Sequence, residues 1–427
     1  MPPSIESHTF LQVSNLNLDS PALIRMGLNQ EHRVARAKEV FGALSRALTE
    51  AKTREVDAVY VVGNLWDNQT VCQETISLVI DAFAQLGDLP VFIAPGKNDP
   101  CRVDSAYNPH FLRALGLKQW SKNVHIFRSE QLTAVEHPLL ADLKIWGHSF
   151  LAPTEERLKQ WQDNLAKRSK GHFDLLLLTE PVEGAFATSE LSEAARRHVL
   201  TEKQIVASGF DYIAFGFGSN QHRLRDDGDR LLGAQTGSLV GQKFSEVGAR
   251  VAFFGKAQKN SKGATESSVE AVEFDNRRIL AHSVDMSGMT AGDAMVDIMQ
   301  SFEELGARKG VDIVQLELEG RYQVGQEPTA VIEKIKESFF QAVVQDNTRP
   351  NYLAETFAPG SSEARFIKAM LVLKKEAEKR MSAEEVTADG EQAPAGMDHL
   401  SGRVVEDALY YGLEALRQKR VNLRNVD

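Results

Sequence analysis

The sequence lacks any long apolar segment. None of its 427 residues belongs to a run that approaches the 18 or more apolar residues needed to cross a membrane. Residues 1–20 contain no basic segment followed by an apolar core, so we expect no secretory signal. These two absences favour a cytoplasmic protein with no membrane partner.

Cysteine is scarce: Cys72 and Cys101 are the only two in the chain. Two cysteines in a chain of this length indicate a reducing compartment. We interpret both as structural thiols and expect no disulfide between them.

An excess of positive charge is also missing. The formal net charge is −10 and the sequence pI is about 5.7. A protein that binds DNA on its own usually carries a basic surface that neutralises phosphates. The acidic total therefore argues against a simple nuclease that acts alone, although a local basic groove stays compatible with it.

Short apolar runs alternate with helical stretches through the first half of the chain. We expect strands at 8–14, 56–63, 89–96, 142–150, 172–179 and 210–216, and helices at 31–52 and 75–86. Strands that are apolar on both faces and separated by helices are typical of an α/β domain whose sheet is covered on both sides.

The pattern changes after about residue 269, and the rest of the chain predicts smaller parts. We expect strands at 268–288 and 311–320 and helices at 291–305, 328–344, 363–379 and 403–418. The polar, acidic stretch near 382–396 is typical of a linker. The predicted organisation is a main domain (1–285), a small α+β domain with a helix (286–380), an acidic linker (381–400) and a C-terminal docking helix (401–427).

Four distinctive loops follow predicted strands, at 14–21, 63–67, 94–100 and 216–221. Each is short and rich in Gly, Asn, Asp or Pro, and turn chemistry alone would account for any one of them. Sites in open α/β folds form from loops at the carboxyl ends of strands, so four such loops in order point to one site.

The loops also carry a family resemblance. The segments LNLDSP, VVGNLWD, IAPGKNDP and DYIAFGFGS resemble the motif frames of the calcineurin-like metallophosphoesterase superfamily, and within it the SbcD/YhaO-like DNA repair exonucleases. The segments GSLVGQKFSEVGARVAFF and ILAHSVDMSG are similar to later parts of that family. The resemblance covers roughly residues 8–290. It implies an α/β fold, an αββα sandwich with a small α+β capping domain and C-terminal helices.

Members of that family hold two divalent metals, typically manganese, that act together on a phosphodiester. The residues that stand at the family's metal-ligand positions are Asn15, Asn17, Asn64, Lys97, Thr179, Phe217 and Ser219, and Asn98 stands at the position of the catalytic histidine. All eight differ from the family pattern.

The chemistry of these eight replacements disfavours metal. Divalent ions need anionic oxygens and imidazole nitrogens, whereas Asn is a weaker neutral donor and Phe offers no lone pair. A unit charge such as the Lys97 ammonium at about 4 Å repels a cation by about 4 kcal/mol at an effective dielectric of 20. We therefore expect no metal cofactor and no catalytic residue, which makes the chain a pseudoenzyme of this family.

Asp19 and Asp99 remain in the first and third loops. Both are expected to cap turns or to pair with Lys97, and for Asp99 the turn role is favoured. The Lys97 ammonium is expected to point into the former metal pocket, beside one of these aspartates or among Asn15, Asn64 and Asn98. His148 and His222 stand near strand ends without the spacing of a ligand set.

The resemblance also implies a partner, an SbcC/YhaN-like ATPase with a long coiled coil, and contact with DNA through that complex; a homodimer is compatible with it. Tyr410, Tyr411, Leu413 and Leu416 form an apolar face on the last predicted helix. That face either lies in a partner's groove or packs on its own domain. Two other functions stay open: an active metal-dependent exonuclease or phosphoesterase with an altered site, and a phosphate or nucleotide sensor that uses Lys97 and Asn98.

Overall fold

The computed structural model describes residues 7–140, 143–150, 173–196, 199–259, 265–384 and 401–418, together with positions 156 and 159. The chain divides into two compact units, Met1–Ile279 and Leu280–Asp427, and each is described by itself. Most of the expected linker, residues 385–400, lies outside the described residues, whereas 381–384 continue a helix. No helix in the described ranges is long and apolar enough to cross a membrane.

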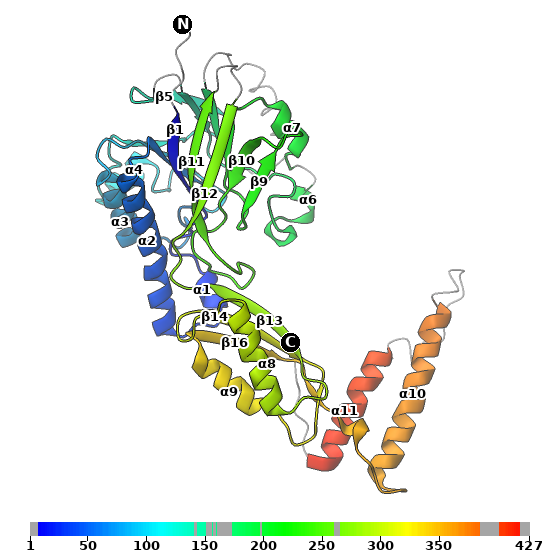
Figure 1. Cartoon of the computed structure of the whole chain (residues 1–427). Coiled ribbons are helices and arrows are strands. Elements are labelled where there is room, and N and C mark those ends of the chain that lie inside the picture. Colours follow the sequence, from blue (N-terminus) through cyan, green and yellow to red (C-terminus); the bar gives the residue numbers. More distant parts are fainter. Residues whose placement is uncertain are drawn as a thin grey trace. The chain divides into compact units, whose positions relative to one another are not determined.

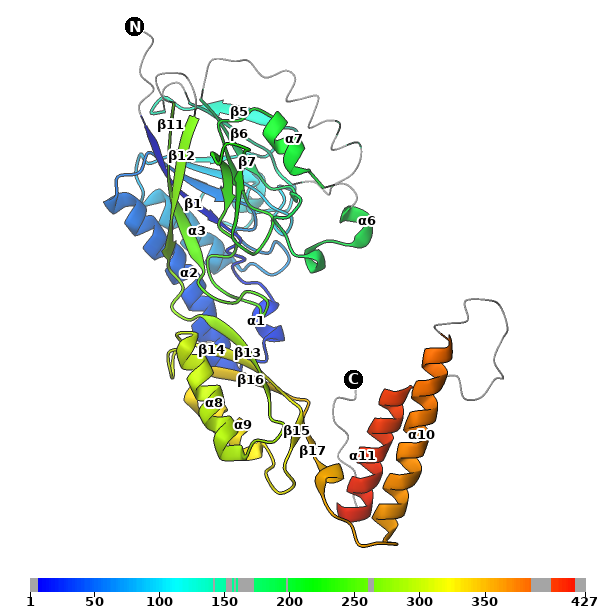
Figure 2. The same cartoon turned by 45° about the vertical axis from the view of Figure 1, so that its right-hand side comes forward.

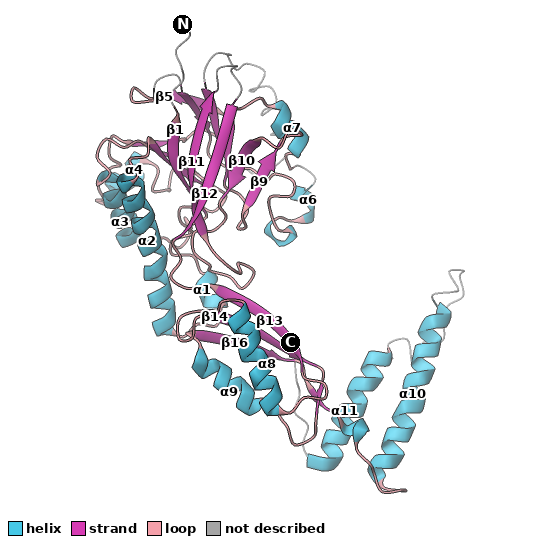
Figure 3. Ribbon diagram, in the orientation of Figure 1, coloured by secondary structure: helices cyan, strands magenta, loops and turns pink. Residues whose placement is uncertain are grey.

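The first unit is built on two six-stranded sheets (Figures 1 and 3). The first sheet has the order β12 (Thr265–Glu273), β11 (Val251–Lys259), β1 (His8–Ser14), β2 (Ala58–Val62), β3 (Val91–Ala94) and β4 (Val124–Ile126). The second has the order β5 (Thr133–Glu136), β6 (Leu143–Gly147), β7 (Phe173–Leu178), β8 (Tyr212–Phe215), β10 (Leu231–Gln235) and β9 (His222–Arg225). In both sheets the central strands are parallel and at least one edge strand is antiparallel.

The two sheets pack face to face because side chains alternate between the faces of each strand. Inward-facing residues such as Phe10, Tyr60 and Phe92 of the first sheet form one core with Leu175 and Tyr212 of the second. The outward-facing residues of the first sheet form a separate core with two helices, α2 (Gln30–Thr53) and α3 (Gln73–Ala84). The outward-facing residues of the second sheet form a further core that includes Ile205, in the helix Glu202–Ala207. Together these layers confirm the predicted αββα sandwich.

Shorter helices complete the first unit: α1 (Ala22–Arg25), α4 (Pro109–Ala114), η1 (Thr188–Glu190), α6 (Glu193–Arg196) and α7 (Glu202–Ala207). The two long helices begin at side-chain caps. Asn29 accepts a hydrogen bond from the His32 N–H at the start of α2, and Cys72 accepts one from Thr75 at the start of α3. Such caps satisfy N–H groups that the first helical turn leaves unpaired.

The parallel strands bring their carboxyl-end loops to one edge of the sandwich. The Asn15 N–H donates to the Gly63 carbonyl at 3.1 Å, and the Gly63 N–H donates to the Ala94 carbonyl at 2.8 Å, so the first three loops are joined by backbone bonds. The fourth loop approaches them closely. A Cβ at Gly216 would lie 1.9 Å from the Val62 carbonyl oxygen, so only glycine fits there.

The second unit contains a three-stranded sheet of β13 (Ile279–Asp285), β14 (Ile313–Glu319) and β16 (Gln341–Asp346). Helices α8 (Ala291–Glu304) and α9 (Thr329–Ser338) share one apolar core with it. The helix predicted for 328–344 is therefore wrong beyond Ser338. Residues 341–346 pair in parallel with β14 instead, because the strand pairing outweighs a local pattern that fits either structure.

The same unit continues through β15 (Arg321–Tyr322), β17 (Arg349–Pro350) and η2 (Tyr352–Ala354) to two helices, α10 (Ser362–Glu384) and α11 (Gly402–Gln418). These two helices lie side by side (Figure 2) and run antiparallel, since Lys374 pairs with Glu406 while Gly412 lies against Phe366. We call them the helical hairpin.

The inner face of the helical hairpin is apolar. Leu409, Tyr410 and Leu413 of α11 are buried against Phe366, Ile367 and Met370 of α10 and against Tyr352. The face that was a candidate for partner docking, Tyr410 and Leu413, is therefore occupied within the chain. Intramolecular packing, the alternative left open above, is correct for these residues because α10 offers them a matching apolar stripe.

Candidate functional site

The loops at the carboxyl edge of the first sheet hold several Asn and Asp residues in an unusual backbone conformation. Asn15, Asn17 and Asn64 have φ values of 48°, 46° and 43°, and Asp19 has 57°. Asn and Asp tolerate this left-handed region better than other non-glycine residues. Turn chemistry thus accounts for part of the Asn and Asp content of these loops, as the simpler interpretation of them expected.

The side chains of Asn15, Asn17, Asn64 and Asn98 form one hydrogen-bonded group, which we call the amide cluster. The Asn98 side chain donates to Asn17 Oδ1 at 2.9 Å, and the Asn98 backbone N–H donates to Asn64 Oδ1 at 2.8 Å. The Asn64 side chain donates to Asn15 Oδ1, and Asn15 Nδ2 donates to the carbonyls of Gly216 and Gly218. Every side-chain oxygen of Asn15, Asn17 and Asn64 thus already accepts a hydrogen bond inside the protein.

Asp99 lies buried beneath the amide cluster. Its carboxylate accepts hydrogen bonds from the backbone N–H groups of Gly96, Asn64 and Leu65, at 2.6, 3.1 and 2.7 Å. The Tyr107 hydroxyl donates to it at 2.6 Å. Burial raises the pKa of Asp99 to about 6, and these four donors lower it by less. Asp99 therefore ties the second and third loops together, which is the turn role predicted for it.

Lys97 is placed differently from the prediction. Its ammonium donates to the Glu190 carbonyl at 3.0 Å and lies 4.8 Å from the centre of the Phe217 ring. Among the described residues these are its partners, rather than Asp19 or Asp99. The reason is that Asp99 is already saturated with donors, whereas Phe217 presents a ring face that attracts a cation.

The pKa of Lys97 is lowered. Burial is the largest cause, the Glu190 carboxylate opposes it, and the ammonium of Lys243 lowers the pKa further. A lysine that is partly buried against a ring and bonded to a carbonyl has little freedom to receive a phosphate.

The remaining three of the eight positions lie on the second sheet's side of the same edge. Phe217 is buried beside Phe150 and Phe186, with ring centres 6.0 and 5.9 Å away. Thr179 is buried, and in the described part of the chain its hydroxyl has no hydrogen-bond partner. The Ser219 N–H donates to a carboxylate oxygen of Glu190 at 3.1 Å.

Glu190 is the residue that the sequence did not reveal. It ends η1 and reaches three places at once: its carbonyl accepts from Lys97, and its carboxylate accepts from the backbone of Ser219 and Ala187. It stands in a loop with no recognisable motif, so no pattern in the sequence marks it. Its carboxylate accepts a hydrogen bond from the backbone of Ser219, a former ligand position, although Glu190 lies outside all four loops.

His148 and His222 do not join the amide cluster. His148 Nε2 lies 2.6 Å from a carboxylate oxygen of Glu180, and its Nδ1 lies 3.0 Å from the Ser149 carbonyl. His222 Nε2 lies 3.8 Å from a carboxylate oxygen of Glu202. His148 thus contacts a carboxylate directly, whereas the His222 ring is farther from one, and neither histidine supplies a shifted metal ligand beside the asparagines.

The residues at this edge do not fit the pair of divalent metals that the resemblance implies. The amide oxygens are committed to one another, Asp99 is committed to four donors, and Lys97 brings a positive charge. Across the described ranges, no group of three or more His, Cys, Asp or Glu side chains could hold a metal ion. A metal would have to break the amide bonds and then be held by neutral oxygens alone.

A groove of about 470 Å³ opens beside the amide cluster. Of the eight positions only Asn17 lines it; the other walls come from α1, α2 and the start of α3, and include Leu23, Arg33, Val34 and Cys72. This groove therefore lies next to the former metal pocket and shares only Asn17 with it.

The solved structures to which the chain is similar include two of low identity. One is TT1561 of Thermus thermophilus, with 14% identity over 62% of this chain and 99% of that one, at a TM-score of 0.34. The other is a dimetal phosphatase from Danio rerio, with 11% identity over 63% of this chain and 99% of that one, at a TM-score of 0.33. No family model and no curated protein matches the chain. Likenesses this distant leave the family unidentified.

Proposed function

We propose that this chain is a non-catalytic, SbcD/YhaO-like member of the calcineurin-like metallophosphoesterase superfamily that works as a scaffold for a partner. Two features support the superfamily: the αββα sandwich, and four loops with the family's motif frames that meet at one edge of it. Members of the superfamily place their metals at that edge, so the residues found there decide between an enzyme and a scaffold.

The observation that carries the proposal is the amide cluster. Asn15, Asn17, Asn64 and Asn98 stand at former ligand and catalytic positions and bond to one another. Four unpaired carboxylates and imidazoles without metal would be costly to bury, whereas amides keep the shape and satisfy one another. This arrangement stabilises the loops and replaces the family's metal ligands and catalytic histidine with neutral amides.

The scaffold role rests on the outer face of the helical hairpin. Leu371 and Val372 of α10 and Val404 and Leu416 of α11 are each more than two-fifths exposed. The exposed side of α10 also carries Arg365, Lys368, Lys375 and Lys379. Glu376 and Glu378 of α10 are exposed as well, so the surface is apolar with mixed charge. Exposed apolar side chains beside basic ones suit an amphipathic helix, and we propose the coiled coil of an SbcC/YhaN-like ATPase, through which the complex reaches DNA.

The two alternative functions receive less support. An active exonuclease would need metal ligands that the amide cluster lacks. A phosphate sensor based on Lys97 and Asn98 would need free donors, but Lys97 is bonded to Glu190 and Asn98 to Asn17 and Asn64.

The proposal is tested by reconstitution of the chain with an SbcC/YhaN-like coiled-coil ATPase from the same genome. We expect a stable complex that is lost in the double variant Leu371→Glu/Val372→Glu and kept in Val296→Glu, which alters an even more exposed apolar residue on α8. We expect no manganese-dependent DNA cleavage from the chain alone. Metal-dependent cleavage by the purified chain, or a complex indifferent to the double substitution, would contradict the proposal.

A further inference from the structure

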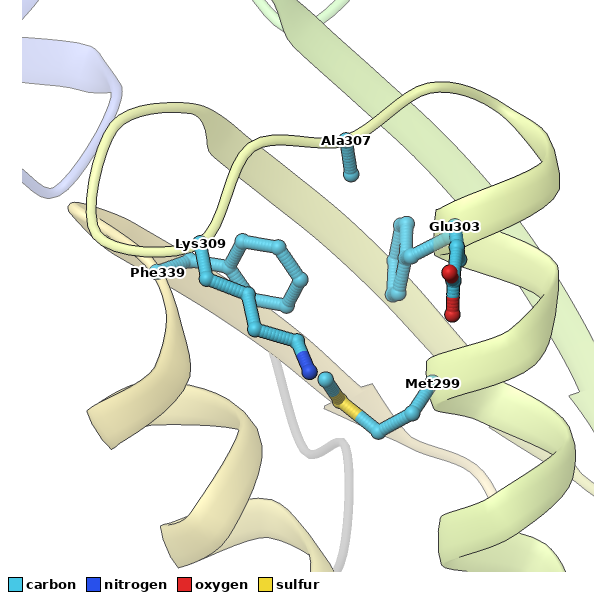
Figure 4. Close-up of a pocket in the computed structure, with 6 residues that line it drawn as sticks. Met299, Glu303, Ala307, Lys309 and Phe339 are labelled. Carbon is cyan, nitrogen blue, oxygen red and sulfur yellow. The ribbon is translucent and has the colours of Figure 1, made fainter.

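A second hollow lies inside the α+β part of the second unit, at the C-terminal end of α8. Its volume is about 320 Å³, near the lower end of the range for small-molecule sites, about 300–1,000 Å³. It is lined by Met299, Phe302, Glu303, Ala307, Lys309 and Phe339 (Figure 4). Nothing in the proposed scaffold function uses it.

The apolar floor of this pocket is held in place by its neighbours. The rings of Phe302 and Phe339 meet edge to face with centres 5.3 Å apart, and the His282 ring lies 5.9 Å from Phe302 on another side. Met299 adds a polarizable thioether that adapts to the shape of a guest. The floor therefore suits an aliphatic or aromatic side chain of modest size.

The loop that closes the pocket is also fixed. The Ala307 N–H donates to the Phe302 carbonyl and the Gly310 N–H to the Ser338 carbonyl, both at 2.8 Å. Arg308 pairs with the fully buried Asp312 at 2.6 Å. Lys309, between these anchors, is thus carried by a loop with a defined backbone, so the pocket exists before any ligand arrives.

Two opposite charges flank the pocket. Figure 4 shows the Lys309 side chain beside Phe339 on one side and Glu303 on the helix at the other. Among the residues that the structure describes, neither charged group has a hydrogen-bond or ion-pair partner. The Ser301, Phe302 and Glu303 carbonyls in the last turn of α8 already accept backbone hydrogen bonds, so the anionic group on this side is the Glu303 carboxylate. The pocket therefore offers a cation, an anion and an apolar floor at separate places.

We propose that this pocket binds a free apolar α-amino acid. The side chain lies on Phe302, Phe339 and Met299, the carboxylate pairs with Lys309, and the ammonium pairs with Glu303. A zwitterion with an apolar body satisfies all three features at once, whereas a fatty acid or an amine would leave one charge unpaired. The proposal is independent of the scaffold function.

The test is a calorimetric or ligand-observed NMR titration of the full chain with L-leucine, L-methionine and L-phenylalanine. We expect saturable binding of at least one of them, and binding at least about tenfold weaker for the matching N-acetyl amino acid and for the matching amino acid amide. These two analogues lack the ammonium and the carboxylate respectively, so each removes one of the two proposed ion pairs.

Variants assign the binding to this pocket. Lys309→Gln and Glu303→Gln should each weaken binding about tenfold, and Ala307→Met should abolish it by filling the hollow. The matched control Glu304→Gln changes the adjacent residue, which does not line the pocket and contacts Gln300 instead, and should bind like the wild type. The proposal is overturned if none of the three amino acids binds saturably, if the blocked analogues bind equally well, or if Lys309→Gln and Glu303→Gln leave the affinity unchanged.

Discussion

The carboxyl edge of the first unit and the helical hairpin of the second differ in which side chains are buried and which are exposed. At the edge, polar side chains are buried and bond to one another: the amide cluster satisfies itself, and Asp99 accepts four hydrogen bonds. On the hairpin, apolar side chains such as Val372 and Val404 stay exposed although an inner apolar face is already packed. The polar groups at the edge are satisfied without a ligand. The hairpin keeps exposed apolar side chains that a partner could cover.

This difference indicates which of the two regions is the better candidate for binding a partner. A ligand at the edge would have to compete with hydrogen bonds that already exist, each of which costs free energy to leave unmade. A partner on the hairpin would instead remove apolar surface from water, worth about 25 cal/mol for each Å². The edge thus acts as a structural element, and the hairpin is the better candidate for interaction.

The largest expected effect concerns Asp99. In Asp99→Ala, three buried backbone N–H groups and the Tyr107 hydroxyl lose their acceptor. We expect the free energy of unfolding of the first unit to fall by about 3 kcal/mol or more, measured by chemical denaturation. The control Asp104→Ala, an exposed residue close by, should stay within about 0.5 kcal/mol. Equal stability of the two variants would show that the edge is not held from within.

The pH dependence of stability should also reveal Asp99. Its folded pKa, raised to about 6 from the usual 3.8, means that the folded protein keeps a proton between these values that the unfolded chain has lost. Stability therefore falls as pH rises from about 4 to about 6, by about 3 kcal/mol. The check is to measure unfolding curves of the wild type and of Asp99→Asn, whose side chain cannot titrate. The difference in free energy of unfolding between the two proteins should change by about 3 kcal/mol between about pH 4 and about pH 6. A constant difference would contradict it.

A smaller effect is expected from returning one acid to the amide cluster. Asn64→Asp removes the donor to Asn15 and buries a charge without a partner, so we expect a loss of about 1–3 kcal/mol at neutral pH. Burial raises the pKa of the new carboxyl, so the loss should diminish as pH falls and the group becomes protonated. Denaturation at pH 7 and pH 5 checks this, and manganese should not restore the stability. A variant as stable as the wild type at neutral pH would show that the edge tolerates charge.

The smallest effect on folding is expected on the outer face of the helical hairpin. Val372→Glu changes an exposed side chain and should alter the free energy of unfolding by no more than about 0.5 kcal/mol. Leu413→Glu, on the buried inner face, should loosen the hairpin, which hydrogen exchange of α10 and α11 would detect. If Val372→Glu also loosened it, the outer face would belong to the core and could not serve a partner.

Much of the first unit could be predicted from the sequence, because its strands are apolar on both faces and its loops carry a known order. The order of the loops predicted that all eight positions lie at one edge, and contacts between the loops of the two sheets agree with this. A Cβ at Gly63 would lie 3.5 Å from the Thr179 side chain, and the Lys97 ammonium contacts the Phe217 ring. The sequence could not show that Glu190 covers Ser219, since a long-range contact from a loop without a motif leaves no local pattern.

Two other expectations failed for similar reasons. Residues 341–346 follow a helix and are apolar enough to continue it, and only their pairing with β14 makes them a strand. Lys97 could pair with an aspartate by proximity in the sequence, but Asp99 was already committed to the backbone of two loops. In both cases a partner distant in the sequence decided the outcome, which composition and periodicity do not report.

The most direct test of the central claim is the metal content of the edge. The full chain is incubated with excess manganese, dialysed mildly and analysed for its elements, with the melting temperature recorded with and without manganese. We expect far less than one manganese per chain and no rise in melting temperature, since a ligand stabilises only by binding the native state. About two manganese ions per chain, together with a raised melting temperature, would contradict the account.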